Sequence, residues 1–201
     1  MSKKRLFYVA FFILLFIGFV AIMSFLIPGF TKKSIPPIGE VKPFSFVNQD
    51  GKTINESVFT NKVVAVEYFF TTCKGICPRM NNNLKKVYEA YKDEKDFLIL
   101  SHTCDPATDS AAQLKKYADS LGVDTNRWMF LTGRKDSLYY MARFAYMIDD
   151  PANNLQNIDD DFLHTQFIAL VNKQGKVVKI YDALKQSELS EMQKEIRKLL
   201  N

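Results

Sequence analysis

Cys73 and Cys77 are the side chains in this sequence best suited to chemistry. They lie four residues apart in the stretch "FFTTCKGICPRM" (Phe69 to Met80), between an apolar run and Pro78. Two neighbouring thiols can form a disulfide, bind a metal ion, act as a redox pair, or simply pack in a core. Redox pairs commonly have the spacing C-x-x-C. The extra residue here can separate the two sulfurs so that both bind one ion. It still allows a disulfide, so the spacing leaves a metal site and a redox pair both open.

The elements that flank the cysteines predict a strand, an exposed loop and a helix. The run "KVVAVEYFF" (62–70) is β-branched and aromatic, which is typical of a buried central strand. Apolar residues recur at helical spacing from Met80 to Tyr91, and Pro78 suits the first turn of that helix. Cys77 then lies where a helix begins. Because a helix N-terminus favours negative charge, it lowers the pKa of a nearby thiol and favours the thiolate, which is both nucleophile and metal ligand.

The rest of the chain predicts an α/β fold. A β-hairpin comes first, with Phe44 and Phe46 alternating before the turn "NQDGK". A long polar loop is expected from Asp149 to Asp161. Alternating strands and helices imply parallel strands, and a late strand pair adds antiparallel ones, so we expect a mixed central sheet flanked by helices, the thioredoxin-like arrangement. The later strands and helices are expected at 96–106, 110–122, 127–133, 136–148, 165–182 and 187–200.

The N-terminus predicts a membrane anchor. Lys3, Lys4 and Arg5 precede an uncharged, almost wholly apolar run over residues 6–27. About 20 such residues suffice to cross the hydrocarbon core of a bilayer. The basic residues predict a cytoplasmic N-terminus, which leaves the rest of the chain on the extracytoplasmic (periplasmic) side.

The length allows one globular domain besides this anchor, since 47% of the 201 residues are hydrophobic. We expect a cytoplasmic stub and transmembrane anchor over 1–30, a proline-containing tether over 31–42 and a globular domain over 43–201. The formal net charge is +5, and the anchor segment carries three of the basic residues, so the domain is close to neutral. This lack of a concentrated basic face argues against nucleic-acid binding.

Four segments resemble motifs of the Sco/SenC family of copper-handling proteins, and they occur in the same order. "EYFFTTCKGICPRM" is similar to the family's C-x-x-x-C-P motif, and "SHTCDPATDSAAQLKKYA" to its S-V-D-P-x-x-D-T segment. "FLTG" matches its L-T-G, and "LHTQFIALVNKQGK" resembles its histidine followed by a strand and a glycine turn. The resemblance covers roughly residues 40–200, and the four motifs together are specific.

The resemblance implies a thioredoxin-like fold that binds one copper ion through Cys73, Cys77 and His164. It also implies a role in maturing the CuA site of cytochrome c oxidase, by copper delivery or by thiol reduction, with the oxidase subunit that carries this site as partner. The chemistry is compatible, because two soft thiolates suit Cu(I) and an added imidazole gives a set that can also hold Cu(II). The protein would then be a metallochaperone rather than an enzyme.

The sequence departs from the family pattern at two positions. Lys74 lies between the cysteines, where many relatives have an acid, and Cys104 stands where valine is usual. A third thiol could be a further ligand, a resolving thiol or a bystander, and we expect a bystander because strand ends often bury small apolar residues. Asp105 could be an outer hydrogen-bond partner of the site. His102 is expected at the surface.

Two alternatives compete with a copper chaperone. An extracytoplasmic thiol–disulfide reductase of the same fold would need only Cys73 and Cys77, with one attacking and the other resolving. A structural zinc site could use both of these cysteines together with Cys104 and His164. His164 separates the first two hypotheses, because the chaperone requires it and the reductase does not.

Overall fold

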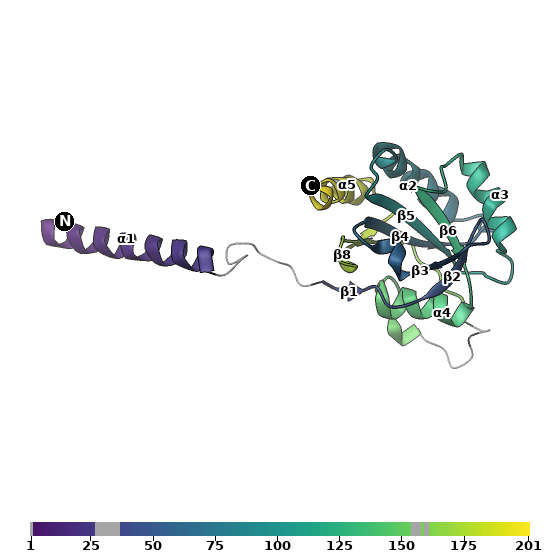
Figure 1. Ribbon diagram of the computed structural model, residues 1–201, viewed down its shortest axis with the longest axis horizontal. Helices are drawn as coiled ribbons and strands as arrows, with labels where there is room; N and C mark the ends of the chain where they lie inside the picture. The colour runs from purple at the N-terminus through teal and green to yellow at the C-terminus, as the bar shows by residue number, and fades with distance from the viewer. Residues whose placement is uncertain (1, 27–36, 154–157, 159–160) are drawn as a thin grey trace. The chain divides into compact units, whose positions relative to one another are not determined.

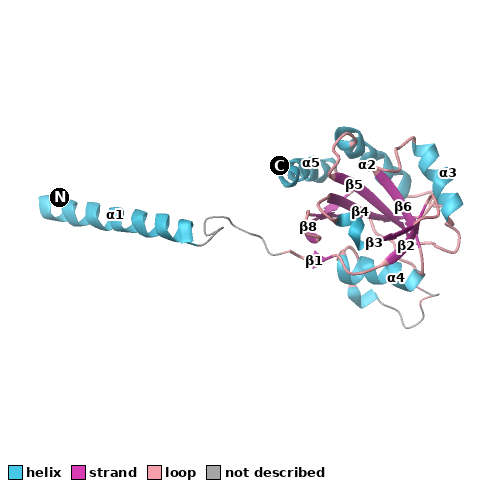
Figure 2. Ribbon diagram, in the orientation of Figure 1, coloured by secondary structure: helices cyan, strands magenta, loops and turns pink. Residues whose placement is uncertain are grey.

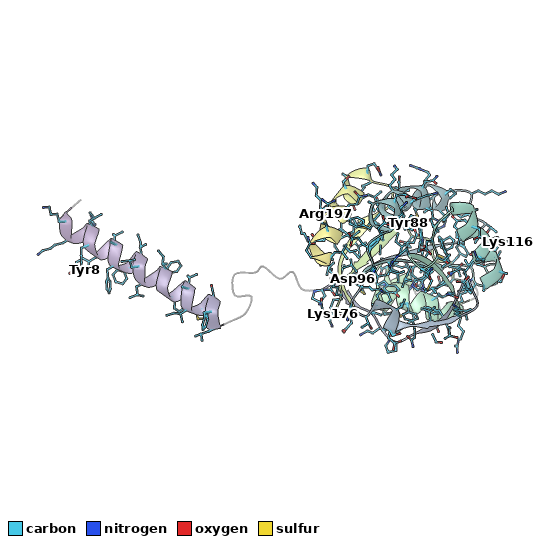
Figure 3. The ribbon with its side chains drawn as sticks, turned by 45° about the horizontal axis from the view of Figure 1, so that its top comes forward. Tyr8, Tyr88, Asp96, Lys116, Lys176 and Arg197 are labelled. Carbon is cyan, nitrogen blue, oxygen red and sulfur yellow. The ribbon has the colours of Figure 1, made fainter. Side chains whose placement is uncertain are left out.

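The computed structural model describes residues 2–26, 37–153, 158 and 161–201, and the chain divides into two compact units, Met1–Pro36 and Pro37–Asn201. The first unit contains one helix, α1 (Lys3–Leu26), with 24 residues and no buried side chain. The side chains of α1 point outward, as Tyr8 does in Figure 3. By length and composition α1 could cross a membrane, in agreement with the predicted anchor. Ile27, the last residue of the predicted span, lies outside the described residues.

The second unit is built on one mixed sheet with the strand order β1-β8-β7-β4-β5-β6-β2-β3 (Figures 1 and 2). Strand β5 pairs in parallel with β4 and β6, while β7 pairs antiparallel with β4 and β8. These pairings confirm the predicted mixed sheet. The strands are β1 (Gly39–Glu40), β2 (Ser45–Asn48), β3 (Thr53–Asn55), β4 (Val63–Phe69), β5 (Phe97–Thr103), β6 (Trp128–Thr132), β7 (Phe167–Val171) and β8 (Lys176–Asp182).

Helices cover both faces of this sheet, and each face has its own hydrophobic core. Helices α2 (Cys77–Tyr91), α3 (Ala111–Leu121) and α5 (Gln186–Leu200) pack on one face (Figure 1). The other face is covered by α4 (Lys135–Tyr140), which continues as one π-helical turn, η2 (Met141–Ala145), and by the 3₁₀ turn η1 (Glu56–Phe59). A further 3₁₀ turn, η3 (Pro151–Asn153), follows η2. Charged side chains such as Lys116 and Arg197 lie at the periphery (Figure 3).

Strand β4 is central and is buried along its whole length. Val63 and Ala65 belong to the core under α2, while Val64 and Val66 belong to the core under α4. A strand that is buried on both faces needs apolar side chains at successive positions, which explains the continuous run in the sequence. Burial of each valine contributes roughly 1.5–3 kcal/mol relative to exposure. The end of β4 is therefore a rigid base for the loop that carries Cys73.

Two predicted boundaries differ from the structure. The short strand β1 pairs with β8, so Gly39 and Glu40 belong to the sheet although they fall in the predicted tether. A two-residue strand with one glycine gives no periodic pattern, which is why the sequence did not indicate it. The expected helix at 136–148 is interrupted, since α4 ends at Tyr140 and the π-helical turn follows.

The prediction that His102 lies at the surface is wrong. The imidazole is fully buried in β5, and its ring centroid lies 5.0 Å from that of Tyr68, 5.4 Å from Phe46 and 5.4 Å from Tyr146. Neither ring nitrogen hydrogen-bonds any described residue. Strand β5 lies between β4 and β6 and is buried on both faces, so even its polar positions point into a core.

Candidate metal centre

The two motif cysteines lie beyond the carboxyl end of β4, where open α/β sheets usually carry their functional groups. Strand β4 ends at Phe69 and α2 begins at Cys77, so Cys73 occupies the connecting loop. The Cys73 N–H donates to the Phe70 carbonyl oxygen at 3.2 Å, and its side chain is half-buried. Cys77 is only 3% exposed, and both cysteines are free thiols. The structure therefore brings these two predicted ligands together, one accessible and one covered.

The surroundings of the two thiols shift their pKa values in opposite directions. Burial opposes ionisation of Cys73, but hydrogen bonds from the Cys77 thiol and from the backbone N–H groups of Gly75, Ile76 and Cys77 outweigh it and lower the Cys73 pKa. Burial, reinforced by its hydrogen bond to Cys73, raises the Cys77 pKa to about 12. Of the two thiols, Cys73 therefore loses its proton more readily, and its thiolate accepts a hydrogen bond from the Cys77 thiol. Such a thiolate is ready to bind a soft metal ion or to attack a disulfide.

A buried carboxylate holds the loop in front of Cys73. Asp109 is fully buried and accepts hydrogen bonds from the Thr71 N–H at 3.1 Å, from the Thr71 hydroxyl, and from the Thr103 hydroxyl at 2.6 Å. It thereby ties the loop after β4 to the end of β5. Sequence reasoning missed this residue as a site component, although it is the second acid of "DPATD".

A second buried carboxyl group lies near Cys77. Glu67 in β4 is fully buried, accepts a hydrogen bond from the Ser101 hydroxyl at 2.6 Å, and faces the amide of Asn81, one turn after Cys77 on α2. Burial raises the pKa of Glu67 to about 8, and its charge in turn raises the Cys77 pKa. The signal for Glu67 was present in the sequence, because it is the lone charge in the run "VVAVEYFF".

His164 is exposed and lies beside the cysteine loop. Its ring centroid is 5.8 Å from that of Phe70, the residue that follows β4, and 6.3 Å from Phe162. His164 and Ile76, the residue before Cys77, line one hollow of about 780 Å³. Among the described residues, however, no three His, Cys, Asp or Glu side chains are close enough together to hold a metal ion. His164 therefore borders the cysteine loop without completing a ligand set in this conformation.

Cys104 lies on the other side of the sheet from Cys77. It is 2% exposed and belongs to the core under α4, whereas Cys77 belongs to the core under α2. Its N–H donates to the Phe69 carbonyl oxygen at 2.7 Å, and its carbonyl oxygen accepts from the Tyr139 hydroxyl at 2.8 Å. Burial raises the pKa of its thiol well above the ordinary value. A protonated, covered thiol is consistent with the predicted bystander, and that role stays a prediction.

Asp105 is engaged within its own loop. Its N–H donates to the Thr103 hydroxyl at 2.9 Å, and its carboxylate accepts from the Thr108 N–H at 3.4 Å. Its predicted part as an outer hydrogen-bond partner of the cysteines stays a prediction. Asp109, four residues later, hydrogen-bonds Thr71 at the start of the cysteine loop.

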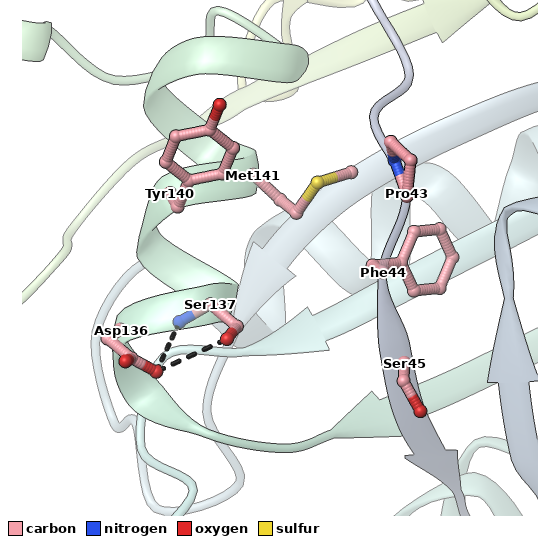
Figure 4. Close-up of a pocket in the computed structure, with 7 residues that line it drawn as sticks. All are labelled: Pro43, Phe44, Ser45, Asp136, Ser137, Tyr140 and Met141. Carbon is pink, nitrogen blue, oxygen red and sulfur yellow. Dashed lines mark hydrogen bonds between the residues drawn. The ribbon is translucent and has the colours of Figure 1, made fainter.

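A separate hollow lies between the start of β2 and α4 (Figure 4). It has a volume of about 360 Å³, and its lining includes Phe44, Asp136 and Tyr140. Asp136 accepts a hydrogen bond from the Ser137 N–H at 2.7 Å and is paired with Arg134. None of the predicted ligands lines this hollow.

Comparison with known proteins gives one consistent result. A model of the SCO1/SenC family matches residues 33–201. The SCO1 protein homolog of Bacillus subtilis (strain 168) is 30% identical over 162 residues, which make up 79% of this chain and 81% of that protein. BsSco, a member of the Sco family of cytochrome c oxidase assembly proteins in which a disulfide switch was identified, has a TM-score of 0.69 at 28% identity, over 83% of this chain and 97% of that one.

A copper-bound relative shares the fold at lower identity. Bradyrhizobium japonicum ScoI, solved with copper bound, has a TM-score of 0.62 at 21% identity, over 81% of this chain and 99% of that one. The likeness to the Sco structures confirms the thioredoxin-like fold expected from the order of strands and helices. With a family match that spans the whole domain, a C-x-x-x-C-P motif that follows the central strand β4, and a histidine beside that motif, the chain belongs to the SCO1/SenC family.

Proposed function

We propose that this protein is a membrane-anchored, extracytoplasmic copper chaperone for assembly of the CuA centre of cytochrome c oxidase. The observation that carries the proposal is the paired Cys73 and Cys77 at the start of α2, with His164 on the same hollow as Ile76. Copper is the cargo, and Cys73, Cys77 and His164 would hold it. The family membership supports this function, since relatives are oxidase assembly proteins and some were solved with copper bound.

The residues of this chain suggest how copper is loaded. Cys73 is the first donor, because hydrogen bonds lower the pKa of its thiol and its side chain is accessible. Cys77 becomes a donor when it loses its proton to solvent or to a nearby base, which an incoming cation favours. His164 then completes the set from across the hollow, and this requires the histidine to move toward the cysteine loop because the three groups are not gathered in the present conformation. A ligand that moves is suited to a protein that must also release its cargo.

The arrangement relative to the membrane is part of the proposal. The apolar helix α1 would span the bilayer with Lys3, Lys4 and Arg5 in the cytoplasm, and Pro37–Asn201 would work on the outer face. The oxidase subunit that carries the CuA site would be the recipient.

The test is a copper titration of the full chain in detergent, reduced and kept under anaerobic conditions. We expect one Cu(I) per chain, loss of binding in Cys73→Ser and Cys77→Ser, and retained but weaker Cu(I) binding in His164→Ala, because two thiolates suffice for a linear site. Stable Cu(II) binding and oxidase maturation should both be lost in His164→Ala. His102→Phe is the matched control, since it removes the other histidine and should leave copper binding unchanged.

A thiol–disulfide reductase remains the second candidate, and one observation favours it. Cys73 and Cys77 are hydrogen-bonded to each other, and the pKa of Cys73 is lowered while that of Cys77 is raised. In that reaction the Cys73 thiolate would attack a disulfide of the partner, and Cys77 would then displace the partner's thiol, leaving Cys73 and Cys77 oxidised. If maturation survives in His164→Ala but fails in either cysteine variant, the reductase replaces the chaperone.

A further inference from the structure

Arg143 is a buried cation whose contacts reach both ends of the polar loop between η2 and β7. It lies in the π-helical turn η2 and is only 1% exposed. Its Nε donates to Asp149 Oδ2 at 2.7 Å, and its Nη1 and Nη2 donate to the two carboxylate oxygens of Asp161 at 2.6 and 3.0 Å. Asp149 and Asp161 are the first and last residues of the polar stretch 149–161 that the sequence predicts as a loop, of which 154–157 and 159–160 lie outside the described residues. One planar guanidinium therefore fastens both ends of the loop, which the single point charge of a lysine could not do.

The fastened end leads directly to His164. Asp161 lies three residues before the histidine, and the Leu163 N–H donates to the Tyr139 hydroxyl at 3.1 Å. The Tyr139 ring lies under the Arg143 guanidinium, with 5.4 Å between the ring centroid and Cζ. Arg143 thus restrains the segment before His164 twice, once through Asp161 and once through Tyr139.

The segment after His164 is held as well. The Thr165 hydroxyl donates to the Ile148 carbonyl oxygen at 3.0 Å, and Ile148 adjoins Asp149. Leu163 and Thr165 are buried on either side, whereas the His164 side chain is exposed. The backbone is therefore held on both sides of an exposed side chain, whose ring lies against Phe70 and Phe162.

Stability alone is a weak reason for such a cluster. Removing two carboxylates and a guanidinium from water carries a large desolvation penalty, and buried ion pairs are often replaceable by apolar residues without loss of stability. The cluster lies at a π-helical turn, and such turns are frequent at functional sites. A role in orienting a nearby group accounts for both features.

We propose that Arg143 is a positioning residue for His164: by clamping Asp149 and Asp161 it holds the His164 backbone beside the cysteine loop, and so controls how readily the histidine joins Cys73 and Cys77 on a copper ion. The inference rests on the proposed function, because it needs His164 to bind copper. Residues that orient a metal ligand typically contribute 10–100-fold to affinity. Loss of the clamp should therefore act through His164 and nowhere else.

The test is a double-mutant cycle on the full chain in detergent, with Cu(I) affinity as the readout. We expect Arg143→Met to weaken Cu(I) binding by about 10- to 100-fold. In a His164→Ala background the same substitution should change affinity less than about twofold, because the residue it positions is gone. The absorption of the Cu(II) form should also shift in Arg143→Met, since it reports how the imidazole approaches the metal.

Further variants test whether weaker copper binding in Arg143→Met results only from loss of folding. Arg143→Met combined with Asp149→Asn and Asp161→Asn removes the buried guanidinium together with the charges of the two described carboxylates that it binds, and Tyr139→Phe removes only one hydroxyl. Both should weaken copper binding in a manner that disappears in the His164→Ala background. Lys115→Met is the control for an ion pair, because its pair with Asp119 is exposed and far along the chain from His164.

The outcomes separate the inference from the proposed function. If His164→Ala leaves copper binding unchanged, the proposed function is wrong and the inference fails with it. If His164→Ala weakens binding but none of the clamp variants does, or if the clamp variants lose as much affinity in the His164→Ala background, the inference alone is overturned.

Discussion

Replacing His102 should protect the fold against acid. The imidazole is fully buried among Phe46, Tyr68 and Tyr146, and no described residue accepts or donates a hydrogen bond at its nitrogens. Burial therefore disfavours the charged ring and lowers the pKa from 6.5 to about 3. The unfolded chain takes up a proton near the ordinary value, whereas the folded chain resists protonation until the medium is far more acidic.

This difference sets both the sign and the size of the effect. Between the two pKa values the unfolded state binds more protons, so stability is fully present above about pH 6.5 and falls as the pH drops toward about 3. At about pH 5 the linkage lowers the free energy of unfolding by about 2 kcal/mol. That is a large share of the 5–15 kcal/mol of a typical domain. In His102→Phe this acid-dependent loss of unfolding free energy should disappear.

Urea denaturation at a series of pH values measures the effect. The change in the free energy of unfolding between about pH 7 and pH 5 should be smaller in His102→Phe than in the native chain by about 2 kcal/mol. The comparison uses the change in the free energy of unfolding with pH. A loss of stability from repacking around the new ring is the same at every pH and therefore does not affect it. His164→Ala is the control, because this sequence has only two histidines and the second is exposed. Equal slopes in the native chain and in His102→Phe would refute the reasoning.

Four further outcomes are expected. Cys104→Val should leave Cu(I) affinity nearly unchanged and shift the free energy of unfolding by less than about 1.5 kcal/mol; a clear loss of affinity would make Cys104 a ligand. Asp109→Asn should lower the free energy of unfolding by about 2 kcal/mol, because the amide cannot replace its charged hydrogen bonds; an unchanged urea midpoint contradicts this. Alkylation of the reduced, metal-free chain should modify Cys73 before Cys77, as peptide mapping will show, since only the Cys73 pKa is lowered; the opposite order rejects the assignment. A reporter active only outside the cytoplasm should work when fused to Asn201, and an inactive fusion rejects the predicted orientation.

The part of the fold with strong local patterns could be predicted from the sequence. The run at 62–70 became β4, and helical spacing after the cysteines became α2 with Cys77 at its first position. Where the elements lie in the sheet could not be predicted in the same way. The hairpin of β2 and β3 was expected, but its attachment to β6 at the far edge depends on tertiary packing that no local pattern records.

The candidate site shows the same division. Cys73 and Cys77 were indicated by residue type and position, because thiols after a strand have few other uses. Asp109 and Glu67 were missed since their roles depend on burial, and an acid in a sequence is first taken as solvated. The prediction for His102 failed for a related reason. A polar residue near a strand end is expected to be exposed unless the strands on both sides of it are known.

The position of β7 in the sheet has a consequence for biosynthesis. Strand β7 pairs with β4, the strand that leads to the cysteines, yet it is made long after β4, β5 and β6. During synthesis the motif cysteines therefore emerge while one edge of β4 is still open and His164 is still absent. Contacts of such wide sequence separation form late, since a long loop must close first. A nascent chain would present Cys73 and Cys77 before His164 can lie beside them, so the arrangement seen in the structure forms only once the domain is complete.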